Sequence, residues 1–84
     1  MKEDEINYSK HVEQRIEERQ LEKQWIIETI LKPDKTIVKS DNEIHYFKKF
    51  ILLAGKFLKV VFNPIKKMVV TAHFDEKMTK SNKS

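Results

Sequence analysis

A basic stripe near the N-terminus contains residue types that could do chemistry. The segment "SKHVEQRIEERQ" places His11, Arg15 and Arg19 four residues apart, so on a helix they share one face. An imidazole exchanges protons near neutral pH, and a guanidinium binds a phosphate through two parallel hydrogen bonds. Cleavage of a phosphodiester without a metal needs such groups: an acid or base, and cations around the phosphate. His11, Arg15 and Arg19 are therefore candidate catalytic residues.

The C-terminal half supplies further candidates, on two predicted strands. Lys59, Thr71 and His73 occupy the more polar set of alternating positions, and Lys67 belongs to the same set. We expect Thr71 to position a phosphate as a fourth catalytic residue, and Lys59, Lys67 and His73 to bind nucleic acid. These side chains point away from the sheet face that the helices cover. They can therefore meet the basic stripe only at an edge or an open end of the sheet.

Each candidate also has a structural interpretation. His11 and Arg15 could form a network that locks the helix to the sheet, and His73 could be an ordinary exposed strand residue. His45, in the longest predicted strand, is interpreted as a surface or core residue. The arginines lie at the margin of the apolar face of their helix, where burial of an unpaired guanidinium is costly. We therefore expect Arg15 and Arg19 either to pair inside the protein or to emerge at a rim where an anion can bind.

Two helices must position the basic stripe. Ser9 can cap a helix of about residues 10–19, and Pro33 ends a second helix of about residues 22–31. From there the period of the apolar residues becomes two, and Asn, Gly and Pro turn signals separate short segments. The predicted strands are residues 35–40, 43–53, 57–63 and 68–74.

This order of elements predicts an α+β fold, with two N-terminal helices packed on one face of a roughly four-stranded antiparallel sheet. Trp25 projects away from the apolar face of the second helix, and we interpret it as a flap over the neighbouring helix. The sheet face without helices is mixed, and its Phe57 and Val69 make it a candidate docking surface. The residues expected in the core are Leu58, Val60, Phe62, Val70 and Ile30.

The length of 84 residues predicts one domain, which we place at residues 8–74, with a loose lead-in at 1–7 and a polar tail at 75–84. The net charge of +4 is unevenly distributed. Residues 1–31 carry five Lys or Arg against eight Asp or Glu, whereas residues 32–84 carry twelve lysines against five Asp or Glu. Such a basic half either faces a polyanion or keeps a small protein in solution.

Composition argues against several classes of function. The chain has no cysteine, so it forms no disulfide and no thiolate site. It has a single glycine, too few for a glycine-rich phosphate loop, and no His, Asp or Glu cluster has the spacing of a metal site. The polar start is not a signal peptide, and the longest apolar run is too short to span a bilayer. We therefore expect a cytoplasmic protein without a cofactor, a metal or a membrane partner.

The segments "SKHVEQRIEERQLEKQWIIETILKPD", "FLKVVFN" and "MVVTAHF" resemble the bacterial family called domain of unknown function 4258. The family pattern is a Ser/Thr-x-His-x-x-x-Arg-x-x-x-Arg helix, a second short helix ending near Pro, and strands closing on an apolar-apolar-Thr segment. The matching residues are Ser9, His11, Arg15, Arg19, Pro33 and Thr71. The resemblance covers about residues 8–74.

The chain departs from this family at two positions. The family usually has Gly where this chain has Gln20, so the turn between the helices should differ or be strained. Glu22 stands where a Ser or Thr helix cap is expected.

The resemblance implies a fold similar to the RelE/ParE-type toxins, which are small helix-helix-sheet ribonucleases or gyrase poisons usually paired with an antitoxin. On that analogy, we expect a metal-independent RNase toxin that acts on RNA. The alternative is a non-catalytic protein-interaction module that binds an antitoxin or a second copy of the chain. The two hypotheses differ in one observable: a toxin arrests its host when expressed alone, and a docking module does not.

Overall fold

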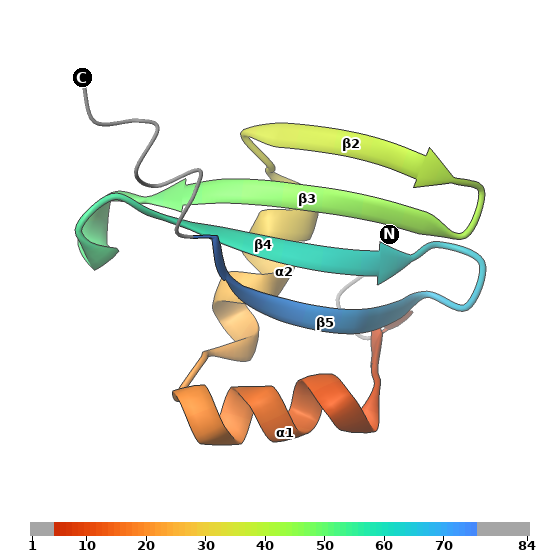
Figure 1. Cartoon of the computed structure of the whole chain (residues 1–84), viewed down its shortest axis with the longest axis horizontal. Coiled ribbons are helices and arrows are strands. Elements are labelled where there is room, and N and C mark those ends of the chain that lie inside the picture. Colours follow the sequence, from red (N-terminus) through yellow and green to blue (C-terminus); the bar gives the residue numbers. More distant parts are fainter. Residues whose placement is uncertain (1–4, 76–84) are drawn as a thin grey trace.

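The computed structural model describes residues 5–75, which form two helices and a five-stranded sheet (Figure 1). In chain order the elements are β1 (Asn7–Tyr8), α1 (Lys10–Arg19), α2 (Lys23–Leu31), β2 (Lys35–Ser40), β3 (Glu43–Phe50), β4 (Lys56–Asn63) and β5 (Met68–Asp75). A 3₁₀ turn, Ile51–Leu53, joins β3 to β4. Both predicted helices and all four predicted strands are present, and the α+β class is confirmed. The strand predicted at residues 43–53 ends at Phe50, because residues 51–53 form the 3₁₀ turn instead. The predicted tail beyond residue 75 lies outside the described residues.

The sheet has the strand order β1-β5-β4-β3-β2 and is mixed. Strands β2 to β5 form an antiparallel meander, whereas β1 pairs parallel to β5. The prediction of four antiparallel strands after a loose lead-in was therefore wrong: Asn7 donates a backbone hydrogen bond of 2.7 Å to the carbonyl of Lys67. A strand of two residues has no alternation to detect, so the sequence pattern does not reveal it.

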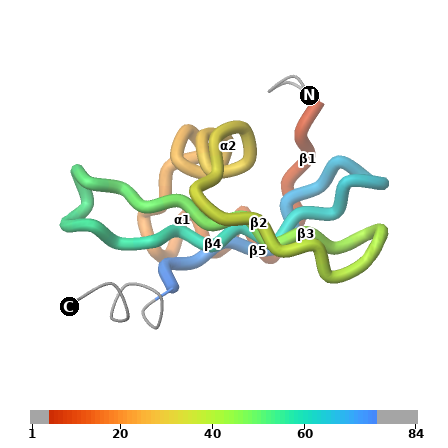
Figure 2. The backbone as a smooth tube through the Cα atoms, turned by 90° about the horizontal axis from the view of Figure 1, so that it is seen from above, coloured from red at the N-terminus to blue at the C-terminus, as the bar shows by residue number. Residues whose placement is uncertain are grey.

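One face of the sheet is covered by the helices and holds the core. Helix α2 crosses β3 and β4, and α1 lies along β5 at the edge of the sheet (Figure 1). Seen from above, α2 lies on one side of the sheet only (Figure 2), and we call the opposite side the open face. Val12 of α1 and Ile26 of α2 are fully buried, and each such side chain contributes roughly 1.5–3 kcal/mol. Four predicted core residues are confirmed in the same cluster: Ile30, Leu58, Val60 and Phe62.

The fifth predicted core residue, Val70, is instead 40% exposed. In the register of β4 with β5, Val61 pairs with Thr71 but Phe62 pairs with Val69. Strand β5 therefore carries one extra residue, a β-bulge at Val70. The bulge shifts the alternation, so that Val69 is fully buried although it was predicted on the mixed face.

Ser9 ties this bulge to the start of α1. Its hydroxyl caps the helix by accepting the backbone N–H of Val12 at 3.1 Å, and it donates to the carbonyl of Val70 at 2.8 Å. Its backbone N–H donates to the carbonyl of Val69 at 3.1 Å. Three hydrogen bonds of one residue therefore fix where α1 begins relative to β5.

The turn between the helices is centred on Gln20, whose backbone is left-handed (φ 53°). The N–H groups of Gln20 and Leu21 both donate to the carbonyl of Ile16, which closes α1 in the way that a terminal glycine usually does. A residue with a Cβ pays about 1–2 kcal/mol in this conformation. The turn is thus strained, one of the two outcomes expected from the sequence. Helix α2 begins after Glu22 without a side-chain cap.

Trp25 of α2 packs over the ends of two strands. Its ring centre lies 6.2 Å from that of Phe50 on β3 and 6.4 Å from that of Phe74 on β5. Tilted contacts of this kind add about 0.5–1.5 kcal/mol beyond burial of area. Trp25 is therefore a flap, as interpreted, but these ring contacts are made with the sheet.

Candidate functional site

Helix α1 and β5 lie side by side and run in the same direction at one edge of the sheet (Figure 1). Strand β1 pairs only with Met68 and Val69 at the start of β5. From Thr71 onward, this edge has no strand beside it in the described part of the chain. The later residues of α1 therefore lie next to the later residues of β5, where the edge is free.

Charged groups of both the helix and the sheet act on His73 of β5. Its pKa is lowered below the ordinary 6.5, first because burial penalises the charged imidazole, and then because Lys59, Arg15 and Arg19 repel a further positive charge. Asp75 acts in the opposite direction. Such charge effects weaken over about 10 Å at moderate salt, so the helix stripe and His73 share one electrostatic environment.

Lys59 and Thr71 extend this group onto the open face. Lys59 is the cross-strand partner of His73, which places their Cβ atoms about 5 Å apart. The Lys59 ammonium lies 5.9 Å from the ring centre of Phe47 on β3. Thr71 is half-buried two residues before His73, on the same side of β5. We call the group the rim site: Arg15, Arg19, Lys59, Thr71 and His73.

The two arginines of the rim site have no partner among residues 5–75. Within residues 5–75, neither Arg15 nor Arg19 forms a hydrogen bond or an ion pair with another described residue. Arg15 is half-buried and Arg19 is exposed. Pairing inside the protein, one of the two arrangements expected for these side chains, is therefore not found among the described residues, and binding of an anion at a rim stays a prediction.

The protonation state of His73 decides what the rim site can do. Because burial and the neighbouring cations lower its pKa, the uncharged form of the imidazole, which can accept a proton, is favoured. The fixed positive charges beside it would stabilise a phosphate whose negative charge increases during a reaction. A neutral base next to fixed cations is suited to removing a proton from a hydroxyl group adjacent to a phosphate.

Two predicted site residues lie apart from the rim site. His11 is exposed near the start of α1, and it is not among the charges that shift the pKa of His73. Lys67 precedes His73 by six residues, a distance of roughly 20 Å along an extended strand. The Lys67 ammonium instead forms an ion pair of 3.4 Å with Glu5. The structure therefore does not bring His11 or Lys67 into the group around His73.

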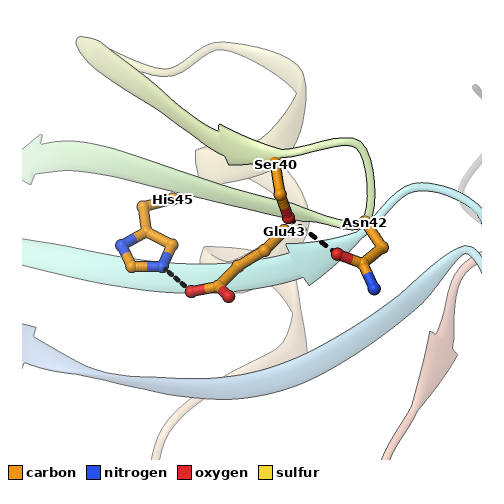
Figure 3. Close-up of polar contacts among 4 residues, drawn as sticks. All are labelled: Ser40, Asn42, Glu43 and His45. Atoms are coloured by element: carbon orange, nitrogen blue, oxygen red, sulfur yellow. Dashed lines mark hydrogen bonds and ion pairs between the residues drawn. The ribbon is translucent and has the colours of Figure 1, made fainter.

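A second histidine, which the sequence pattern did not single out, has a carboxylate partner. Nε2 of His45 lies 2.6 Å from Oε2 of Glu43, two residues earlier on β3 (Figure 3). The His45 side chain is 11% exposed and that of Glu43 is 49% exposed. Residues two apart on a strand share a face, so this spacing was a signal available in the sequence. At the neighbouring turn, Ser40 donates to Asn42 at 2.7 Å (Figure 3).

The apolar docking surface expected on the open face is not observed. Phe57 is only 8% exposed, and Val69 lies in the core. The most exposed apolar side chains lie in the 3₁₀ turn between β3 and β4, where Ile51 is 83% and Leu52 is 97% exposed. Any apolar contact with a partner would therefore involve this turn more readily than the centre of the sheet.

Other kinds of site have little support in residues 5–75. No three His, Asp or Glu side chains in this range come together as metal ligands. Neither α1 nor α2 is long and apolar enough to cross a membrane. A hollow of about 390 Å³ lies away from the rim site, and its lining residues are Gln24, Ile27, Glu28, Leu31, Lys32 and Lys48.

A comparison with protein families gives a match over most of the chain. A family model described as "Domain of unknown function (DUF4258)" matches residues 8–74, a range that contains the whole rim site. This match confirms the resemblance seen in the sequence. No curated protein and no solved structure gives a match, so the likeness to the RelE/ParE-type toxins stays a prediction.

Proposed function

The chain belongs to the DUF4258 family, and on this premise we propose that it is a metal-independent endoribonuclease of single-stranded RNA, of the RelE-like toxin type. The observation that carries the proposal is the pairing of His73 with Lys59 on the strand that packs against α1, where the charges of Arg15 and Arg19 also act on His73. A neutral imidazole surrounded by cations is the arrangement that proton transfer beside a phosphate requires.

In this proposal, His73 takes the acid–base role that the sequence suggested for His11. The reason is positional: the charges of Arg15 and Arg19 act on His73, and His11 lies nearer the other end of the helix. The two guanidiniums hold the scissile phosphate, because their paired N–H donors match its oxygens. Lys59 neutralises part of the negative charge of the phosphate beside His73.

The remaining parts of the proposal concern the substrate. The hydroxyl of Thr71, on the same side of β5, positions the phosphate. A single strand is proposed because attack by a 2′-hydroxyl on the adjacent phosphate needs an in-line geometry that a flexible backbone adopts more easily than a duplex. The excess of lysine over acidic residues in the second half of the chain supports attraction of RNA from solution.

The proposal is tested by cleavage of an unstructured RNA oligonucleotide between pH 5 and 8, in EDTA and with added Mg²⁺. We expect the protein to cut the RNA equally well in EDTA. His73→Asn should slow cleavage by about a hundredfold to ten-thousandfold, because the acid–base group is lost while a polar side chain of similar size is kept. His11→Asn is the matched control, since it makes the same change at an exposed position outside the rim site.

Each outcome of this test has a distinct meaning. Loss of activity in His11→Asn, with His73→Asn unaffected, would return the acid–base role to His11 and contradict the assignment made here. Intact RNA at every pH, with and without Mg²⁺, would exclude a ribonuclease. Expression in a bacterial host adds a second measurement: growth arrest by the natural chain, relieved by His73→Asn, supports the toxin.

The second candidate function is a non-catalytic interaction module, and the exposed turn between β3 and β4 favours it. Two adjacent aliphatic side chains, Ile51 and Leu52, are almost fully exposed there. Their burial by an antitoxin or by a second copy of the chain would recover roughly 1.5–3 kcal/mol for each side chain. A chain that neither cuts RNA nor arrests growth, yet associates with itself or with the product of a neighbouring gene, would support this module.

A further inference from the structure

The open face holds a second imidazole near the rim site, and the proposed function does not use it. His45 of β3 faces the same side of the sheet as Lys59, because its neighbour two residues along, Phe47, is the cross-strand partner of Lys59. The pair of His45 with Glu43, at 2.6 Å, fixes the orientation of the ring. A histidine held in this way by a carboxylate is common where the free ring nitrogen has a chemical task.

The second ring nitrogen of His45 lies on the side of the ring away from Glu43. In Figure 3, Nε2 contacts Glu43 and the other ring nitrogen lies on the far side of the ring, toward the carboxyl end of β3. Phe47 lies in that direction along the strand, and the Lys59 ammonium lies 5.9 Å from the centre of its ring. The next residue across from Lys59 is His73.

The strand register gives the separation of the two histidines. His45 pairs with Val61, and Val61 pairs with Thr71, which is two residues before His73. Two strand spacings and two residue steps put the Cα atoms of His45 and His73 about 12 Å apart. Their positions lie on the same face of the sheet, and Lys59 lies on the strand between them.

We infer that His45, oriented by Glu43, is a second acid–base group of the ribonuclease site, and that the substrate class is a phosphodiester with a free 2′-hydroxyl. This inference rests on the proposed function. It adds a second catalytic residue, it assigns Glu43 as a positioning residue, and it specifies the products. DNA, which has no 2′-hydroxyl, is then not a substrate.

The reaction needs two proton transfers and no other reactant. One imidazole removes the proton of the 2′-hydroxyl, and the 2′-oxygen forms a bond to phosphorus. The bond from phosphorus to the 5′-oxygen breaks, and the other imidazole, in its protonated form, donates a proton to that oxygen. The products are a 2′,3′-cyclic phosphate and a 5′-hydroxyl. Lys59 lies between the two imidazoles, where negative charge builds up on the phosphate oxygens.

The surroundings of the two rings favour opposite roles. His73 faces Lys59, Asp75, Arg15 and Arg19, and its lowered pKa suits the base that takes the first proton.

The Glu43 carboxylate, 2.6 Å from Nε2, holds the His45 ring in one orientation, and we assign the second proton transfer to this fixed ring. Ile37 of β2 and Val61 of β4 flank His45 directly. The charged residues of those two strands whose register positions put them nearest to it on the same face are Lys35 and Lys59.

The inference is tested with uridylyl-(3′,5′)-adenosine and its 2′-deoxy counterpart. We expect the natural chain to cut only the ribonucleotide, with uridine 2′,3′-cyclic phosphate as the first product. His45→Asn should lower kcat by about a hundredfold to ten-thousandfold. Glu43→Gln should lower kcat less and leave KM nearly unchanged, because Glu43 positions the acid without touching the substrate. His11→Asn is again the control.

A binding measurement separates failure of this inference from failure of the proposed function. We expect uridine 3′-monophosphate to shift the ring-proton NMR signals of both His45 and His73 during a titration. Normal cleavage by His45→Asn, a shift of His73 alone, or a 5′-phosphate product would overturn the inference while leaving a ribonuclease in place. An inactive natural chain would refute the proposed function, and a shift of both signals in that chain would still support a shared binding site.

Discussion

The two ends of β5 differ in how their polar groups are used. At its start, polar groups find partners within the chain: Lys67 pairs with Glu5, Asn7 donates to the Lys67 carbonyl, and Ser9 holds the bulge. At its end, the charges of Arg15 and Arg19 act on His73 without any internal partner in the described residues. The first arrangement determines where the helix sits, and the second leaves positive charge available to solvent.

This difference separates structural residues from candidate binding residues on one short strand. A polar group that hydrogen-bonds inside the protein stabilises the fold, so a substitution that removes the group lowers stability. A cation without a partner contributes little to stability, so a substitution that removes it mainly weakens binding of an anion. Variants of the two ends should therefore affect different measurements, and the following predictions are ordered by the size of the expected effect.

Ser9→Ala should produce the largest effect, a loss of about 1–3 kcal/mol in the free energy of unfolding. The substitution removes a helix cap and leaves the Val70 carbonyl without its side-chain donor. Urea denaturation measures the loss. Ser40→Ala is the matched control, because the Ser40 hydroxyl bonds only an exposed turn residue and should change stability by less than about 0.5 kcal/mol. Equal losses in both variants would remove the distinction between the ends of β5.

The double substitution Arg15→Gln and Arg19→Gln should weaken RNA binding while leaving unfolding almost unchanged. Each arginine that contacts a phosphate contributes about 0.7 to the slope of log affinity against log salt for a single strand, so the slope should fall by roughly 1.4. Fluorescence anisotropy with a labelled oligonucleotide at several salt concentrations measures this slope. The control is Lys39→Gln with Lys66→Gln, which removes two exposed charges elsewhere. An equal reduction in the control would mean that net charge alone attracts the RNA.

Lys59→Met should raise the pKa of His73, because Lys59 is the first of the charges that lower it. NMR titration of the His73 ring protons measures the change, and Lys35→Met on the same face is the control. The lowered pKa of His73 also makes the stability of the fold depend on pH. The unfolded chain binds this proton at a higher pH than the folded chain does, so stability is lost as pH falls below 6.5. Lys59→Met should lessen this loss and move the acidic limb of RNA cleavage to higher pH. An unchanged titration would show that Lys59 does not contribute to the shift.

Much of the fold could be predicted because its signals are local. Ser9 and Pro33 mark helix boundaries in the sequence, and the period-two segments mark the long strands. The features that were missed depend on pairing between distant residues. Strand β1 exists because Asn7 meets Lys67, and the bulge at Val70 exists because β5 pairs out of step with β4. Neither contact can be recognised from the spacing of apolar residues in the sequence.

The candidate site could be predicted in part for the same reason. The stripe of Arg15 and Arg19 follows from helical spacing alone. Its meeting with His73 depends on which edge of the sheet α1 covers, and that is set by the hydrogen bonds of Ser9 to β5. His45 and Glu43 carried a local signal, two residues apart on a strand, but alternation alone does not show that the two side chains bond.

Val70 is one residue more than the pairing of β5 with β4 requires, and the strand accommodates it as a bulge. Val69 and His73 are four residues apart, a spacing that puts both on one face of a regular strand, yet here Val69 is in the core and His73 pairs with Lys59 of the open face. A chain without Val70 would keep each side chain on its present face. A relative that is one residue shorter at this position can therefore share the rim site. An alignment of that relative with this chain would need a gap at Val70, because without it every later residue of the strand would be assigned to the wrong face.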